Sequence, residues 1–294
     1  MARPKRLQRQ FSRALAATGR DALAEARRAL TDPKLNEAEL VHAVRKALKR
    51  WRALLRLLGT PLGGEADRMR AEARELMHKL APARDAQAAT DAVRDLRKAK
   101  TVPAEVLTAL RERMTVIRDA AGRDDVTPAL RRSISQYLDY CSMALKRWAL
   151  DDIPLETFAE ALTSGYRRAR RRVPDDWETA TPEALHELRR RVVEYQNQMT
   201  VFERLGAGFS DVASRTQRLR NKLGACQDLR MLEHFVAVHP SLAPWQPRLP
   251  AAIATRRAAH LKNAERAARH VFARKPGSFG RDLAVLAESV PAQT

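Results

Sequence analysis

Five side chains that can carry positive charge recur at helical spacing between residues 42 and 56. They occupy positions i, i+3, i+7, i+10 and i+14 of this segment: His42, Arg45, Lys49, Arg52 and Arg56. On an α-helix, where successive residues are about 100° apart, these positions form one stripe. Like charges at such spacings repel by about a few tenths of a kcal/mol per pair. The stripe therefore indicates either a solvated face paired with acidic residues of neighbouring helices or a surface that binds a polyanion.

The other side of the same segment is apolar and predicts how the stripe is held in place. Its apolar residues gather on one face of the helical wheel: Val44, Ala47, Leu48, Trp51, Leu54, Leu55 and Leu58. Asn36, followed three residues later by Glu39, forms a capping-box pattern at the start, and Gly59 with Pro61 marks the end. We therefore expect one helix that packs its apolar face into a core and presents the basic stripe elsewhere.

Composition places the chain among basic globular proteins. Its 294 residues include 55 Lys and Arg against 35 Asp and Glu, a formal net charge of +20, and 45% are hydrophobic, which suffices for a packed core. Most of the cationic excess is Arg, whose planar guanidinium matches phosphate oxygens in a two-pronged fashion. Net charge informs about partners rather than fold. The expected partner is anionic: a nucleic acid, an anionic membrane or another phosphate polymer.

Proline and glycine residues divide the remaining chain into further helical segments, and no stretch alternates as a strand would. The pattern and the abundance of Ala, Leu, Arg and Glu predict an all-α fold. The expected helices, with approximate bounds, are 11–30, 65–80, 84–100, 103–121, 128–148, 151–172, 181–206, 210–223, 227–238 and 251–274, with a short one beyond Gly280.

The chain lacks the sequence patterns of metal, redox and phosphoryl-transfer sites. Cys141 and Cys226 sit in amphipathic segments without a C-x-x-C or Cys/His cluster, so we expect buried free thiols in a reducing compartment and no metal or cofactor. No glycine-rich phosphate loop, H-E-x-x-H motif or nucleophile elbow occurs. No secretory signal and no apolar stretch of 18 residues occurs either. We therefore expect a cytoplasmic protein that is not an enzyme.

Two short blocks recur in the same order at nearly the same separation. The matched pairs are His42 and Arg45 with His186 and Arg189, at an offset of 144 residues, and residues 79–85 with residues 222–228, at an offset of 143. This pattern predicts a tandem duplication, with one helical bundle in residues 8–150 and another of similar topology in residues 151–288. The second copy keeps the apolar face but loses the stripe, since Lys49, Arg52 and Arg56 are matched by Val193, Gln196 and Thr200.

These residues resemble the CHAD family, the conserved histidine α-helical domain. The family pattern places an Arg three, a Lys seven and an Arg ten residues after a His, which His42, Arg45, Lys49 and Arg52 match. A second element, Leu-Gly-x-x-Arg-Asp, is similar to residues 80–85 and 223–228, with Ala81 and Gln227 as departures. Residues 166–172 are similar to the family's basic helix ahead of the second histidine. The resemblance extends over about residues 8–288.

The resemblance implies two four-helix bundles related by a pseudo-two-fold axis, with basic residues lining a central cavity that binds inorganic polyphosphate. It also implies a stand-alone CHAD protein, since some relatives carry a CYTH domain for which this chain has no room. The residues expected to bind polyphosphate are His42, Arg45, Lys49, Arg52, Arg56, Arg74, Lys79, Arg84, Arg168, Arg171, Arg172, His186, Arg189, Arg190, Arg218 and Lys222. Asp85 and Asp228 are expected to orient an arginine or cap a helix, and both histidines to contact phosphate or to be hydrogen-bonded structural residues.

Polyphosphate carries about one negative charge per unit, so its binding would release counterions and weaken steeply with salt, by analogy with DNA. The favoured function is therefore polyphosphate binding, with targeting to polyphosphate granules. A nucleic-acid-binding helical protein ranks lower because aromatic residues are only 5% and Trp51 and Tyr195 fall on apolar faces. An enzyme acting on phosphoanhydrides would need metal-holding carboxylates. A scaffold whose charge serves solubility would bind all anions weakly and equally.

Overall fold

The computed structural model describes residues 2–80, 82–99, 102–122, 126–205 and 207–288 and is built from helices. No strand occurs among these residues, so the expected all-α fold is confirmed. In chain order the elements are α1 (Ala2–Thr31), α2 (Glu37–Leu57), α3 (Gly59–Leu62), α4 (Gly64–Lys79), α5 (Pro82–Ala99), α6 (Ala104–Gly122), α7 (Pro128–Arg147), η1 (Leu150–Asp152), α8 (Leu155–Arg170), α9 (Pro182–Glu203), α10 (Ala207–Val238), η2 (Pro240–Trp245), α11 (Pro250–Val271) and α12 (Pro276–Glu288).

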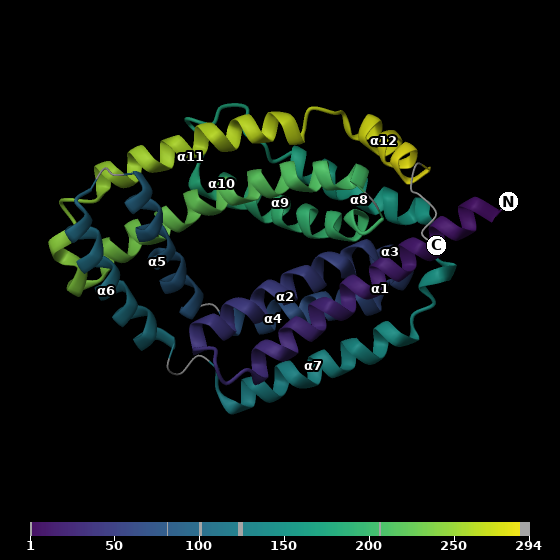
Figure 1. Ribbon diagram of the computed structural model, residues 1–294, viewed down its shortest axis with the longest axis horizontal. Helices are drawn as coiled ribbons and strands as arrows, with labels where there is room; N and C mark the ends of the chain where they lie inside the picture. Colours follow the sequence, from purple (N-terminus) through teal and green to yellow (C-terminus); the bar gives the residue numbers. More distant parts are fainter. Residues whose placement is uncertain (1, 81, 100–101, 123–125, 206, 289–294) are drawn as a thin grey trace.

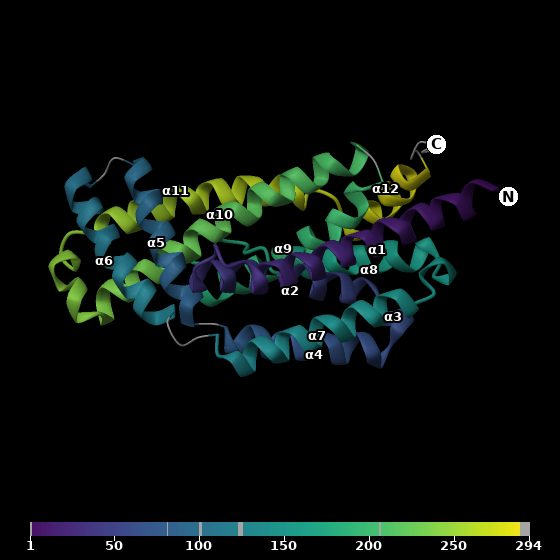
Figure 2. The ribbon, with the colours of Figure 1, turned by 60° about the horizontal axis from the view of Figure 1, so that its bottom comes forward.

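The helices form an elongated molecule in which most of them run along the long axis (Figure 1). One apolar core joins α1, α2, α4 and α7 to α8, α9, α12 and parts of α10 and α11. A second core joins α5 and α6 to η2 and to other residues of α10 and α11. Figure 2 shows α5 and α6 at one end of the molecule, beside α10 and α11. Each core therefore contains helices from both residues 8–150 and residues 151–288, and the boundary between these stretches stays a prediction.

Helix α2 carries the basic stripe, and its start follows the predicted capping box. The Asn36 side chain accepts a hydrogen bond from the Glu39 backbone at 3.0 Å, and the Glu39 carboxylate accepts one from the Asn36 backbone at 3.1 Å. These bonds satisfy two backbone groups that an uncapped helix start leaves unpaired. Gly63, at φ 52°, then turns the chain into α4 in a conformation that favours glycine.

The apolar face of α2 is buried as predicted, and Trp51 is its largest member. The Trp51 indole is fully buried and stacks on Trp148 with 6.0 Å between ring centroids. Its N–H donates to the Tyr137 hydroxyl at 3.1 Å, and that hydroxyl donates to the Met69 carbonyl at 2.8 Å. The chain of hydrogen bonds ties α2 to α7 and α4, so it fixes the direction in which the basic stripe points.

Helix α10 differs from its prediction because it is one continuous helix rather than two segments meeting near Gly224. It packs along α5, α9 and α11, and this tertiary packing outweighs the low helix propensity of one glycine. A Cβ atom at Gly224 would lie 3.9 Å from the Arg189 guanidinium, so the Arg189 side chain covers this position. Residues 79–85, whose sequence was matched with residues 222–228, do not lie on one helix, since α4 ends at Lys79 and α5 begins at Pro82.

Candidate polyanion-binding pocket

Four helices, α2, α5, α9 and α10, enclose a polar pocket of about 140 Å³. We call it the inner pocket. Five cationic side chains and two carboxylates lie among its lining residues, which are His42, Arg45, Lys46, Lys49, Gln87, Ala88, Asp91, Arg189, Asn197, Arg220 and Asp228. Cations from helices that are far apart in the sequence therefore meet around one small volume.

The structure brings together four of the residues expected from the two histidine motifs. His42, Arg45 and Lys49 reach the inner pocket from consecutive turns of α2, and Arg189 reaches it from α9. Arg45 and Lys49 are half-buried, as is Arg189, so their charges are partly shielded from solvent. The Arg45 guanidinium also donates a hydrogen bond to the Met77 carbonyl, which holds the side chain against the end of α4. Asp228, expected to orient an arginine, lines the same pocket.

Arg220 lines the inner pocket although the sequence analysis singled out its neighbours Arg218 and Lys222 instead. Its guanidinium donates to the Gln196 side chain at 2.7 Å, and burial lowers the pKa of Arg220, which still remains protonated at neutral pH. A spacing signal was present, because Arg220, Gly224 and Asp228 follow one another at intervals of four residues and so share a helix face.

Helix α5 supplies a wall of the inner pocket that the sequence analysis did not identify. Gln87 and Asp91 lie one turn apart on it, and the Gln87 amide donates to the Asp91 carboxylate at 3.2 Å. Asp91 also accepts from Arg94 at 3.1 Å. The carboxylates of Asp91 and Asp228 offset part of the repulsion among the pocket cations, which lets the cations lie close together.

The second half of the stripe, Arg52 and Arg56, lies beyond the inner pocket and meets a carboxylate. The Arg56 guanidinium pairs with Glu194 of α9 at 3.0 Å, and Arg168 of α8 approaches the same carboxylate at 3.4 Å. Burial lowers the pKa of Arg56 to about 10, although Glu194 opposes the shift. Burial and the nearby Arg70 also lower the pKa of Arg52, whose Nε atom is buried with no hydrogen-bond partner in the described part of the chain.

The remaining expected residues whose side chains are described lie outside the lining of the inner pocket. That they contact polyphosphate stays a prediction. Arg74 and Lys79 are exposed on α4, Arg171 and Arg172 are exposed at the end of α8, His186 and Arg190 are exposed on α9, Arg218 is exposed on α10, and Lys222 is half-buried there. The Arg190 guanidinium pairs with Glu187 at 3.0 Å. The Arg84 side chain lies outside the described residues.

Across the described ranges, no group of three or more His, Cys, Asp and Glu side chains is arranged to hold a metal ion. None of the helices in those ranges combines the length and apolar character that a membrane crossing requires. Cys141 and Cys226 are free and buried, as expected, and burial raises the pKa of each thiol to about 12.

Comparison with known proteins gives a family and a fold. The family model described as the CHAD domain matches residues 13–237, which is most of the chain. The crystal structure of the CHAD domain from the plant Ricinus communis is similar at a TM-score of 0.56 and 16% identity, covering 93% of this chain and 91% of that one. PptA from Streptomyces chartreusis is similar at a TM-score of 0.52 and 16% identity, covering 89% and 97%. No curated protein matches the chain.

Proposed function

Because the chain belongs to the CHAD domain family, we propose that it binds inorganic polyphosphate, and that the inner pocket is where the polymer is held. The observation that carries the proposal is the meeting of Arg45 and Lys49 with Arg189 and Arg220 around one polar volume. These cations come from three helices, so a chain of phosphates held between them could be contacted from several sides. Guanidinium groups suit such a ligand because they donate paired hydrogen bonds to phosphate oxygens.

The size of the inner pocket restricts how much polymer it holds. About 140 Å³ admits only a few phosphate units, so a long chain must continue outside it. The stripe on α2 offers a path, because His42 and Arg56 are separated by about 21 Å along the helix axis at 1.5 Å per residue. Along that path Arg52 and Arg56 lie next, and Glu194 competes with phosphate for Arg56.

We propose binding without catalysis. The polar groups that line the inner pocket are cations, an imidazole, side-chain amides and two carboxylates that offset the cations. This set can neutralise and orient an anionic chain. We also propose a cytoplasmic location in association with polyphosphate granules, which a fluorescent fusion can test by co-localisation with a polyphosphate stain in wild-type cells and cells unable to make the polymer.

Competition binding tests the proposed function. Labelled long-chain polyphosphate would be bound at near-physiological salt and competed with duplex DNA, RNA and heparin. The site variant is Arg45→Ala/Lys49→Ala/Arg189→Ala, and the control is Arg20→Ala/Arg27→Ala/Lys146→Ala, which removes the same charge from exposed positions of α1 and α7. We expect a preference for polyphosphate and a loss of at least about 100-fold in the site variant, since each charge-assisted contact contributes about 1.5–3 kcal/mol.

Two outcomes would overturn the proposal. Equal losses in the site and control variants would mean that net charge alone drives binding. A preference for DNA or RNA, lost in the same site variant, would assign the inner pocket to nucleic acid instead. Thermal unfolding of both variants guards against a loss that results from misfolding.

A further inference from the structure

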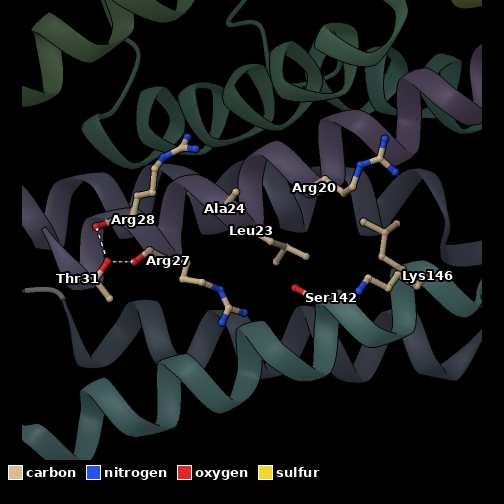
Figure 3. A pocket seen from close by; sticks show the side chains of 9 residues that line it. Arg20, Leu23, Ala24, Arg27, Arg28, Thr31, Ser142 and Lys146 are labelled. Atoms are coloured by element: carbon tan, nitrogen blue, oxygen red, sulfur yellow. Dashed lines mark hydrogen bonds between the residues drawn. The ribbon is translucent and has the colours of Figure 1, made fainter.

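A second cavity lies away from the inner pocket, between α1 and α7, and encloses about 560 Å³. We call it the outer groove. Figure 3 shows Leu23 projecting from α1 into the space between the two helices, with Ser142 and Lys146 reaching toward it from α7. Leu23 and Leu145 form its apolar floor and are only 3% and 6% exposed, and Ala24 is half-buried beside them.

The outer groove lies between two helices that contact each other near both of its ends. Near Gly19 they are in close contact, since a Cβ atom there would lie 2.9 Å from a Leu145 methyl group and 3.2 Å from the Trp51 ring. Near the other end, the Arg131 guanidinium of α7 donates a hydrogen bond to the Leu30 carbonyl at 3.0 Å. The groove follows α1 from Arg20 to Thr31. This stretch of α1 is about 16 Å long, at 1.5 Å per residue, which matches three turns of a docked helix.

The rim of the outer groove is cationic. Arg20, Arg27 and Lys146 lie around the floor and are exposed, and Arg28 extends from the same helix on the side away from α7 (Figure 3). Asp139 pairs with Arg27 at 2.6 Å, with both side chains about half exposed, so this pair remains open to exchange with another carboxylate.

We propose that the outer groove binds an acidic amphipathic helix of a partner protein. Such a helix would place apolar side chains at i, i+4 and i+7 over Leu23, Ala24 and Leu145, in the manner of helix-in-groove recognition. Its flanking Asp and Glu residues would pair with Arg20, Lys146 and Arg27. The inference is independent of polyphosphate binding, since it uses other helices and other side chains.

The chemistry of the outer groove argues against the other anionic occupants. Polyphosphate would leave the apolar floor unused. A flat bilayer surface would not reach a floor that lies between two helices. A second copy of this chain carries a net charge of +20 and would be repelled by the same rim.

A pair of synthetic 18-residue peptides tests the proposal by fluorescence anisotropy. One peptide carries Leu at i, i+4 and i+7 with Glu on both flanks, and its partner has the same composition in scrambled order without an apolar stripe. The first floor variant, Ala24→Trp, fills the groove, and Ala17→Trp is its control because Ala17 is half-buried on α1 outside the groove. The rim variant is Arg20→Ala/Arg27→Ala/Lys146→Ala.

We expect the amphipathic acidic peptide to bind, with a loss of at least about tenfold in both the floor and rim variants, and little change in Ala17→Trp or in Arg45→Ala/Lys49→Ala/Arg189→Ala. Absence of binding would overturn the proposal, as would equal binding of the scrambled peptide, or a loss confined to the inner-pocket variant. The proposal would also be overturned by a different occupant of the groove. This would be shown if polyphosphate, anionic vesicles or a second copy of the chain bound in a way that the rim variant weakens and Ala24→Trp leaves unchanged.

Discussion

The inner pocket and the outer groove both gather cations, but they differ in what lies between those cations. In the inner pocket, four helices surround a small polar volume whose walls include amides and carboxylates. In the outer groove, two helices hold their cations above buried leucines, and the volume is about 560 Å³ against about 140 Å³. A net charge of +20 therefore does not define one partner. The surface beneath the charges decides whether a phosphate chain or an amphipathic helix is favoured.

The substitution Trp51→Ala should affect both regions and have the largest effect. Trp51 is fully buried on the face of α2 opposite the basic stripe, and its ring also lies against Gly19 where α1 meets α7. Replacing a buried Trp by Ala typically costs about 3–5 kcal/mol of stability. Urea unfolding should show this loss, and polyphosphate and peptide binding should both weaken. The control is Trp245→Ala, at a half-buried residue of the second core. A change below about 1 kcal/mol in the free energy of unfolding for Trp51→Ala would contradict the role of Trp51 in supporting both regions.

The substitution Asp95→Asn should weaken the packing of α5, which forms one wall of the inner pocket, against α11. Asp95 lies one turn after Asp91 on α5 and accepts from Arg256 at 2.7 and 3.0 Å, while His260 lies 2.6 Å from the same carboxylate. Burial opposes ionisation of Asp95, but the hydrogen bonds from Arg256 and His260 hold its pKa below the ordinary value of 3.8. We expect Asp95→Asn to lower the free energy of unfolding by about 2 kcal/mol at pH 7, which is the size of a charge-assisted hydrogen bond.

The sign of the pH dependence follows from the lowered pKa of Asp95. Its ionised form stabilises the fold fully above pH 3.8, and this contribution is lost as the pH falls through the lower folded-state pKa. Urea unfolding of Asp95→Asn and wild type should therefore differ at pH 7, and the difference in the free energy of unfolding should shrink as the pH falls below 3.8 and through the lowered pKa. Asp139→Asn is the control at the outer groove, where an exposed pair contributes only about 0–1 kcal/mol. A difference for Asp95→Asn that persists at low pH would exclude the charge as its cause.

The sequence was sufficient to predict the local structure of α2 and the meeting of α2 residues with Arg189 of α9. The capping box, the buried apolar face and the common stripe of His42, Arg45 and Lys49 all follow from spacing along one helix. Arg189 was found because the histidine motif recurs, and the CHAD resemblance is confirmed by the family match. The duplication itself and its pseudo-two-fold axis stay predictions.

The other walls of the inner pocket depend on how helices cross, which spacing does not specify. Arg218 and Arg220 are both basic and only two residues apart, about 200° on a helical wheel, and the packing of α10 decides which of them faces α2. Because a helix break was expected near Gly224, the sequence did not predict that Arg220, Gly224 and Asp228 lie along one face of a continuous helix. For Arg56, pairing with Glu194 depends on the approach of α9, which the sequence of α2 does not reveal.

A comparison of Arg220→Ala with Arg218→Ala tests that register directly. Arg220 lines the inner pocket and Arg218 is exposed. We expect Arg220→Ala to weaken polyphosphate binding about tenfold and to reduce the slope of log Kd against log salt by about 1, since one cation no longer displaces a counterion. Arg218→Ala should change Kd less than about twofold, and neither should alter peptide binding. The reverse order would show that the polymer follows the outer side of α10.

The smallest expected effect uses the two free thiols as reporters of the two regions. Cys141 lies on α7, whose Ser142 and Lys146 line the outer groove, and Cys226 lies on α10, whose Arg220 and Asp228 line the inner pocket. Burial raises the pKa of both thiols to about 12, so labelling at pH 8 requires a local opening of the helix. A ligand that binds the closed form slows such an opening.

Mass spectrometry of each cysteine peptide would measure the two labelling rates separately. Saturating polyphosphate should slow the labelling of Cys226 about threefold or more and that of Cys141 less, whereas the amphipathic acidic peptide should do the opposite. If both ligands slowed the labelling of both thiols equally, labelling would proceed through global unfolding. Cys141 and Cys226 would then be labelled at the same rate as each other in urea at sub-denaturing concentration. Opposite slowing requires that α7 and α10 open independently, and therefore that the two cationic regions are energetically separate sites.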